Sequence, residues 1–341
     1  MSNGLVLAVD GGGVKTDLAL LEPSGTLLAH VRGGRSQAYH LGVDGCVEVL
    51  EDLLERAVAR AGVGPLERPF AATAQVMLAG ADLPEEVSAL HAGLEQQNWS
   101  DGLVVDSDMP PLLRAGTDRG WGVAVVCGNG INCLGVAPDR REARFLSFGR
   151  LSGDWGGGRD IGLAALGAAV RAADGRGPAT RLEHAVPEHF GLADPLAVAR
   201  AVHLEEMPVG RLGELTPIVL SASDSDSVAA RIVERLAGEV TAFACAAVRR
   251  LELGDADPDV VLGGGVLRAV SPSVVQTIAG GVEQVARRAR VVVARSEPIV
   301  GAALLGLDAI GADQSAKARA RAELDAAVVA ELSTRVVERL R

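Results

Sequence analysis

Two glycine-rich segments of this chain share one order of features, and they constrain its fold more than any other part of the sequence. The first joins two apolar stretches, 5–9 and 17–21, through Asp10-Gly11-Gly12-Gly13. The second joins two apolar stretches through Gly128-Asn129-Gly130. Each pattern predicts two strands linked by a tight turn, then a polar turn and a third short strand. Two such hairpins facing each other can hold a polyphosphate between their backbone amides, so the repetition predicts a two-lobed ATP-dependent phosphotransferase.

A single glycine loop of this kind is weaker evidence, because Asp-Gly and Gly-Gly are also the usual residues of a plain hairpin turn. Two other nucleotide motifs are excluded. Val14 stands where a Walker A loop needs glycine before Lys15, and a strand follows the glycines where a dinucleotide fingerprint needs a helix. A third glycine site, Gly263-Gly264-Gly265, follows a predicted strand and opens a helix, where an adenosine can lie against bare backbone. Three such sites together indicate nucleotide binding far more specifically than one site does.

Composition limits the class of protein. The chain has 341 residues, enough for two domains, and no apolar run reaches the roughly 18 residues of a membrane span. Its net charge of −11 disfavours nucleic acid and anionic membranes as partners. The four cysteines have no CxxC spacing, and residues 1–4 lack the features of a signal peptide. We therefore expect a cytoplasmic protein that holds an anionic ligand by local amides, dipoles and metal.

The order of predicted elements is the same in two parts of the chain. We expect an N-terminal lobe over 1–118, a C-terminal lobe over 119–312 and a charged helical tail over 313–341. Each lobe begins with three strands and continues with helices alternating with strands, which predicts a mixed α/β sheet. No long Pro/Ser linker separates the lobes, so we expect them to be closely hinged around an interdomain cleft. The expected strands are 4–10, 14–21, 26–32, 72–79, 103–105, 121–127, 131–137, 143–148, 260–262 and 290–294, and the expected helices are 43–61, 84–97, 227–251, 272–289 and 300–311.

These motifs carry a resemblance over about residues 4–311. The chain resembles the sugar-kinase/actin/heat-shock ATPase superfamily and, within it, the N-acetylglucosamine kinase and BadF/BadG/BcrA/BcrD-type ATPase family. The resemblance implies two ribonuclease H-like (actin-like ATPase) domains that bind ATP and Mg²⁺. It implies that Asp10 binds the Mg²⁺ ion, directly or through water. The nucleotide contacts that it implies are Gly11, Gly12, Gly13, Lys15, Thr16, Gly128, Asn129, Gly130, Gly238, Gly264 and Gly265. The sequence departs from the family pattern at Val14, where relatives have threonine, and at Asn129 and Ile131 in the second loop.

Two carboxylates follow the predicted strand 103–105. On the residues alone, Asp106 and Asp108 are equally well explained as caps of the next helix or as catalytic groups. The resemblance implies a general base at this strand end, and counting back from Leu113-Arg114-Ala115-Gly116 places it on Asp108. A sugar hydroxyl is a weak nucleophile, and a positioned carboxylate can accept its proton during in-line phosphoryl transfer.

The segment 147–158 is the expected sugar-binding segment. By the resemblance, Asp154 accepts hydrogen bonds from sugar hydroxyls, while Trp155 replaces a family glutamate and is expected to stack on a sugar face. Gln37 stands where close relatives carry a sugar-binding asparagine. The full set of substrate-binding residues that the resemblance implies is Gln37, Asp108, Ile131, Asn132, Phe148, Gly149 and Asp154.

Gly238 lies inside the predicted helix 227–251, where glycine costs about 1 kcal/mol relative to alanine. Close packing against another helix and the family's nucleotide contact explain it equally well. No HExxH motif or Cys/His cluster is present in the sequence, so no transition metal is expected, and Mg²⁺ is expected to arrive with ATP.

Three functions follow from the sequence and the resemblance. The first is a kinase that phosphorylates the 6-hydroxyl of an amino sugar, with N-acetylglucosamine ahead of glucosamine, N-acetylmuramic acid and glucose. The second is an activator ATPase that couples ATP hydrolysis to electron delivery from an iron–sulfur cluster. The third is a non-catalytic sugar sensor, which is disfavoured because no helix-turn-helix or cysteine-rich zinc loop is present. Family relatives are often dimers, so the resemblance also allows a homodimer.

Overall fold

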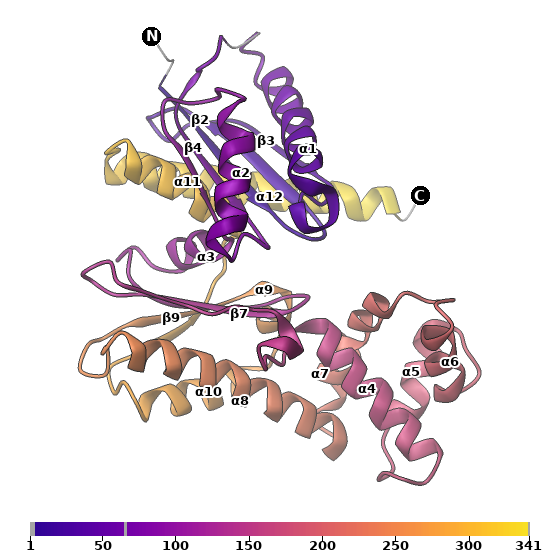
Figure 1. The fold of residues 1–341 in the computed structure, drawn as a ribbon. Coiled ribbons are helices and arrows are strands. Elements are labelled where there is room, and N and C mark those ends of the chain that lie inside the picture. Colours follow the sequence, from indigo (N-terminus) through magenta and orange to yellow (C-terminus); the bar gives the residue numbers. More distant parts are fainter. Residues whose placement is uncertain (1–3, 65–66, 340–341) are drawn as a thin grey trace. The chain divides into compact units, whose positions relative to one another are not determined.

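The computed structural model describes residues 4–64 and 67–339, and the side chains up to 331 (Figure 1). It confirms the mixed α/β fold with two five-stranded sheets. The chain forms two compact units, one of residues up to Gly120 together with those from Ala294 onward, and one of Trp121–Val293. The segment 294–312 therefore belongs to the first unit and not to the second lobe, where the sequence pattern had placed it. None of the helices in the described part combines the length and apolar character needed to cross a bilayer.

The first unit is built on a sheet of mixed direction. β1 (Leu5–Gly11) pairs antiparallel with β2 (Thr16–Leu21) and parallel with β4 (Ala71–Leu78). Of the outer strands, β3 (Leu27–Gly33) pairs antiparallel with β2, and β5 (Leu103–Asp106) pairs parallel with β4. Every residue of β1 and β2 is buried, so both faces of the sheet centre are covered. In spatial order the strands are β3 (Leu27–Gly33), β2 (Thr16–Leu21), β1 (Leu5–Gly11), β4 (Ala71–Leu78) and β5 (Leu103–Asp106).

Alternate residues of β1 belong to two different cores. Leu7 and Val9 pack with the helices on one face, whereas Val6 and Ala8 pack with those on the other. The first face is covered by α1 (Ala38–Ala61) and α2 (Pro84–Glu95). The second face is covered by α11 (Pro298–Ala309) and α12 (Gln314–Arg339). The expected tail helix is α12, and it packs on the first sheet.

The second unit repeats this arrangement of strands. β6 (Gly122–Cys127) pairs antiparallel with β7 (Ile131–Val136) and parallel with β9 (Asp259–Gly263), as β1 does with β2 and β4. The order is β10 (Arg290–Val293), β9 (Asp259–Gly263), β6 (Gly122–Cys127), β7 (Ile131–Val136) and β8 (Glu142–Arg144). Its described α-helices are α4 (Gly157–Ala173), α5 (Leu182–Phe190), α6 (Pro195–His203), α7 (Thr216–Ala222), α8 (Ser227–Arg250), α9 (Gly264–Ala269) and α10 (Pro272–Glu283), with 3₁₀ turns at Gly149–Leu151 and Val209–Leu215.

Helix α11 lies unusually close to its neighbours because two of its residues have no side chain. A Cβ atom on Gly301 would lie 1.8 Å from the carbonyl oxygen of Pro111, in α3 (Met109–Gly116). A Cβ atom on Gly306 would lie 2.4 Å from the Val6 side chain, in β1. These two contacts hold β1, α3 and α11 in a fixed relation.

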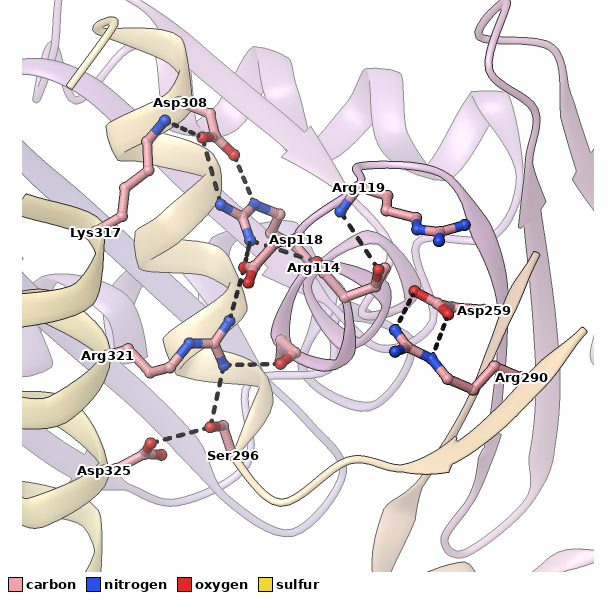
Figure 2. Close-up of polar contacts among 12 residues, drawn as sticks. Arg114, Asp118, Arg119, Asp259, Arg290, Ser296, Asp308, Lys317, Arg321 and Asp325 are labelled. Atoms are coloured by element: carbon pink, nitrogen blue, oxygen red, sulfur yellow. Dashed lines mark hydrogen bonds and ion pairs between the residues drawn. The ribbon is translucent and has the colours of Figure 1, made fainter. Parts of the chain in front are cut away.

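Ion pairs at the edge of this packing join α3, α11 and α12 (Figure 2). The buried Arg114 donates from Nε to Asp308 at 2.7 Å, and Lys317 Nζ lies 2.8 Å from the same carboxylate. Arg321, from α12, donates to the carbonyl oxygen of Ala115 at 2.8 Å. A buried guanidinium needs charged or hydrogen-bonding partners. These contacts therefore favour one arrangement of α3, α11 and α12 beyond what the apolar packing alone requires.

The packing predicts that Gly301→Ala destabilises the protein, because the added methyl group has no space beside Pro111. We expect a loss of about 1–3 kcal/mol, typical of overpacking. Gly167→Ala in α4 is the matched control, since no atom lies within 4 Å of the new Cβ, and it should be neutral or slightly stabilising. Urea unfolding of both variants measures the difference, and equal stability would contradict the close packing of α11.

Candidate functional site

Asp10 lies near the carboxyl end of β1, directly opposite Asp17 in β2. Its side chain is buried, and burial raises its pKa to about 8. The Lys15 charge opposes this shift, whereas the charges of Asp17, Asp108 and Glu297 add to it. Charged side chains from distant parts of the sequence therefore act on the carboxylate at the end of β1.

Asp17 is a site residue that the sequence analysis missed. It is fully buried, and its carboxylate accepts hydrogen bonds from Arg32 Nε at 2.7 Å and from Arg32 Nη2 at 2.9 Å. The carboxylate also forms a hydrogen bond of 2.8 Å with His30 Nε2. Burial alone would raise its pKa, but these hydrogen bonds and the Lys15 charge outweigh burial and hold the pKa of Asp17 well below its usual value. The available signal was an acidic residue in an apolar strand, two positions after Lys15.

The polar side chains that follow the first loop have partners inside the first unit. Lys15 Nζ lies 3.0 Å from Asp17 Oδ2 and 2.9 Å from Glu297 Oε2. Thr16 is buried, and its hydroxyl donates to Ser36 Oγ at 2.8 Å. The hydroxyl of Thr16 thus fixes the loop against the segment before α1, while the Lys15 side chain keeps about a third of its surface exposed.

The first glycine loop packs against the start of α1. None of Gly11, Gly12 and Gly13 has a positive φ, so a plain left-handed turn does not explain these glycines. A Cβ on Gly11 would lie 2.4 Å from Ser36 Oγ, and one on Gly13 would lie 2.6 Å from Gln37 Oε1. The structure therefore brings Gln37, expected at the sugar, onto the expected phosphate loop.

Asp108 and Asp106 differ in their surroundings. Asp108 occupies the N-cap position of α3, but its side chain makes no capping hydrogen bond. Burial raises its pKa to about 6, and the charge of Asp82 adds to the shift. The Asp106 carboxylate instead accepts from the Ser107 amide at 2.6 Å. The structure thus gives no support to the capping interpretation of Asp108, and it adds Asp82 as a second carboxylate whose charge acts on Asp108.

The second glycine loop is held by the start of α4. The amide of Gly158 donates to the Gly128 carbonyl at 2.7 Å, and a Cβ on Gly157 would lie 2.4 Å from the Asn129 carbonyl oxygen. Gly157 also has φ +81°, so both conformation and space require glycine there. By contrast, a Cβ on Gly128 or Gly130 would meet no atom within 4 Å.

The third glycine site lies against the second. A Cβ on Gly264 would lie 2.3 Å from the carbonyl oxygen of Cys127, the residue before Gly128, whereas Gly265 has open space. Gly238, in α8, also has no atom within 4 Å of the Cβ position. Close packing within the described structure therefore does not explain Gly238.

The residues expected to contact the sugar lie in different local environments. Asp154 accepts from Ser152 Oγ at 2.5 Å, and Phe148 and Gly149 lie at the start of the 3₁₀ turn. Ile131 and Asn132 open β7 and are buried, with Asn132 Oδ1 accepting from the Cys133 amide at 2.7 Å.

Trp155 does not fit the expected sugar-stacking role. Its side chain is only 8% exposed, and the Arg235 guanidinium lies 4.2 Å from the ring centroid. The ring packs in the core of the second unit, so stacking on a sugar is excluded in this conformation.

Comparison with known proteins identifies the family. The model of the BadF/BadG/BcrA/BcrD ATPase family matches residues 7–306. The chain belongs to this family.

Similar proteins agree with the family match. An N-acetylmuramic acid/N-acetylglucosamine kinase of Clostridium acetobutylicum is 26% identical over 269 residues, 78% of this chain and 86% of that protein. An N-acetyl-D-glucosamine kinase of Dictyostelium discoideum is 22% identical over 322 residues, which cover 90% of this chain and 99% of that protein.

Solved structures share the fold. A protein of Chromobacterium violaceum, described as a candidate N-acetylglucosamine kinase, has a TM-score of 0.72 at 25% identity and covers 90% of this chain and 100% of its own. A ROK family glucokinase of Streptomyces griseus has a TM-score of 0.54 at 18% identity and covers 90% of this chain and 99% of its own. At this identity the likeness is evidence of a shared fold only.

The open surroundings of Gly128 give a test of phosphate binding in this ATPase-family loop. No described atom lies within 4 Å of a Cβ added at Gly128, so we expect Gly128→Val to leave the fold unchanged. If the loop amides bind phosphate, the side chain blocks their approach and weakens ATP binding roughly tenfold, as for the loss of one charge-assisted hydrogen bond. Calorimetric titration with a non-hydrolysable ATP analogue measures this, with Gly167→Ala as control. Wild-type affinity in Gly128→Val would remove the loop from the nucleotide site.

Proposed function

We propose that this chain is an ATP-dependent sugar kinase that transfers the γ-phosphate of ATP to the 6-hydroxyl of an amino sugar, with N-acetylglucosamine as the first candidate. The observation that carries the proposal is the Asp108 carboxylate. It makes no capping bond, its pKa is raised to about 6, and its charge acts on Asp10 beside the first glycine loop. The names of the two curated relatives support an amino sugar as the phosphate acceptor.

In this proposal ATP is held mainly by backbone. The amides of the three glycine sites bind its phosphates and leave room for the adenosine, and Lys15 supplies one cation. Backbone amides suit a chain of net charge −11, whose overall field repels an anion. The proposed nucleotide residues remain Gly11, Gly12, Gly13, Lys15, Thr16, Gly128, Asn129, Gly130, Gly238, Gly264 and Gly265.

The residue proposed for Mg²⁺ fits the ion chemically. Asp10 offers carboxylate oxygens, the ligands that Mg²⁺ prefers, and burial raises its pKa to about 8 despite the charge of Lys15, so a bound cation would favour its ionised form. No group of three or more His, Cys, Asp or Glu side chains in the described residues is arranged to hold a metal. Asp10 would hold the ion together with the phosphates of ATP. When bound, Mg²⁺ neutralises charge on the transferring phosphoryl group.

The proposed chemistry at Asp108 is a single proton transfer. The sugar hydroxyl loses its proton to the Asp108 carboxylate while its oxygen bonds to the γ-phosphorus and the bond to the β-phosphate oxygen breaks. A pKa of about 6 keeps this carboxylate ionised at neutral pH and makes it a stronger base than an ordinary aspartate. Asp154, Gln37, Ile131, Asn132, Phe148 and Gly149 are the residues proposed to contact the sugar.

The cysteines argue against the activator ATPase. Cys46, Cys127, Cys133 and Cys245 are all buried in the cores, and burial raises the pKa of Cys127 to about 12. Cluster ligation needs thiolates that converge on one accessible point, so these positions do not favour an iron–sulfur site.

A coupled assay of ADP release with ATP, Mg²⁺ and a panel of sugars tests the proposal. We expect N-acetylglucosamine to give the highest rate, and Asp108→Asn to lower kcat at least about 100-fold, the scale of general-base loss. Asp106→Asn is the matched control and should keep most of the activity. An inactive Asp106→Asn beside an active Asp108→Asn would mean that the other carboxylate is the base, and no release with any sugar would refute the kinase.

The raised pKa of Asp108 predicts a pH dependence. Below pH 6 the carboxylate becomes protonated and cannot accept a proton, so kcat/KM for the sugar at saturating Mg-ATP should fall about tenfold per pH unit. Between about pH 7 and 8 the rate should be level. The residual activity of Asp108→Asn should lack this acidic limb, and a limb near pH 4 in the wild type would show that burial does not perturb the group.

A further inference from the structure

Lys15 is held between two carboxylates that come from distant parts of the chain. Its ammonium lies 3.0 Å from Asp17 Oδ2 and 2.9 Å from Glu297 Oε2. Asp17 is completely buried and Glu297 is 18% exposed, so both partners are largely removed from solvent. Ion pairs in such partly buried settings are screened less than pairs on the surface.

Glu297 is the N-cap residue of α11, but its side chain does not cap the helix. An N-cap glutamate would ordinarily stay near the first amides of its helix, where negative charge is favoured. Here the carboxylate reaches Lys15 on the glycine hairpin, 282 positions away in the sequence.

The packing of α11 fixes the position of Glu297. Pro298 begins the helix, and Gly301 allows close contact with α3 one turn later. Gly306 then allows close contact with β1, the strand that leads into the hairpin. The carboxylate therefore projects from the residue directly before a closely packed helix, and this fixed start of α11 suits it to orient another side chain.

Two anchors restrict the Lys15 ammonium more than one anchor does. A lysine side chain has four rotatable bonds and loses considerable entropy when it is ordered at the moment of binding. Asp17 already accepts from Arg32, whereas Glu297 holds the ammonium from the side of α11. An ammonium has three N–H donors, so two ion pairs are compatible with a third bond to a phosphate oxygen.

We propose that Glu297 is a positioning residue for the nucleotide: it orients the Lys15 ammonium toward the phosphates of ATP. This inference rests on the proposed binding of ATP at the first glycine hairpin. It does not depend on the identity of the sugar, because its test measures nucleotide binding alone.

Glu297→Gln removes the charge and keeps the length of the side chain. We expect about tenfold weaker binding of a non-hydrolysable ATP analogue with Mg²⁺, the scale of one charge-assisted hydrogen bond. Glu297→Asp shortens the side chain, keeps the charge and should lie between Glu297→Gln and the wild type. With an active sugar, KM for ATP should rise while KM for the sugar stays the same.

Asp308→Asn is the matched control, because it makes the same acid-to-amide change on the same helix and breaks ion pairs with Arg114 and Lys317 (Figure 2). It should lower the melting temperature and leave the affinity for the analogue unchanged. An equal loss of affinity in Asp308→Asn and Glu297→Gln would show that any loosening of α11 has this effect, and would overturn the proposal.

A double-mutant cycle separates action through Lys15 from other effects. If Glu297 acts by orienting Lys15, Glu297→Gln should weaken analogue binding no further once Lys15→Met is present. Full additivity of the two losses would contradict the proposal. If Lys15→Met itself binds the analogue like the wild type, the hairpin lysine has no role in nucleotide binding, and this inference fails whether or not the protein phosphorylates a sugar.

Discussion

The close packing of α11 against β1 and α3 is the constraint on which the candidate site of the first unit depends. Gly301 and Gly306 let the helix approach both elements to distances that no side chain would permit. Asp10 lies near the end of β1, Asp108 precedes α3 and Glu297 precedes α11. The packing of these three elements brings the carboxylates into one region, where the charges of Asp108 and Glu297 contribute to the raised pKa of Asp10.

Such a gathering of negative charge costs stability unless cations balance it. The structure balances it unequally. Asp17 has the cations of Arg32 and Lys15 beside it and a hydrogen bond with His30, and its pKa is lowered, whereas burial dominates at Asp10 and raises its pKa to about 8. The unbalanced position is the one proposed for Mg²⁺, and the balanced position keeps the lysine of the hairpin in place. A cation bound at Asp10 would favour the ionised form of this carboxylate.

Local patterns in the sequence predicted a large part of this structure. The two hairpins, the strand before Asp108 and the strand-to-helix turn at Gly263-Gly264 follow from apolar periodicity and glycine placement, which act over a few residues. The return of residues 294–312 to the first unit could not be predicted in this way, because periodicity shows that a helix has an apolar face but not which sheet that face covers. The role proposed for Glu297 could not be predicted for the same reason. Trp155 was misjudged because its environment depends on Arg235, on a helix much later in the chain.

The most direct test of the account follows the γ-phosphate. ³¹P NMR of a reaction with ATP, Mg²⁺ and ¹³C-labelled N-acetylglucosamine shows where the phosphate goes. The account predicts ADP and a phosphate ester whose phosphorus is coupled to carbon 6 of the sugar, in equal amounts. Release of inorganic phosphate at a rate independent of the sugar would contradict it and would make this chain an ATPase that uses the same hairpins for a different purpose.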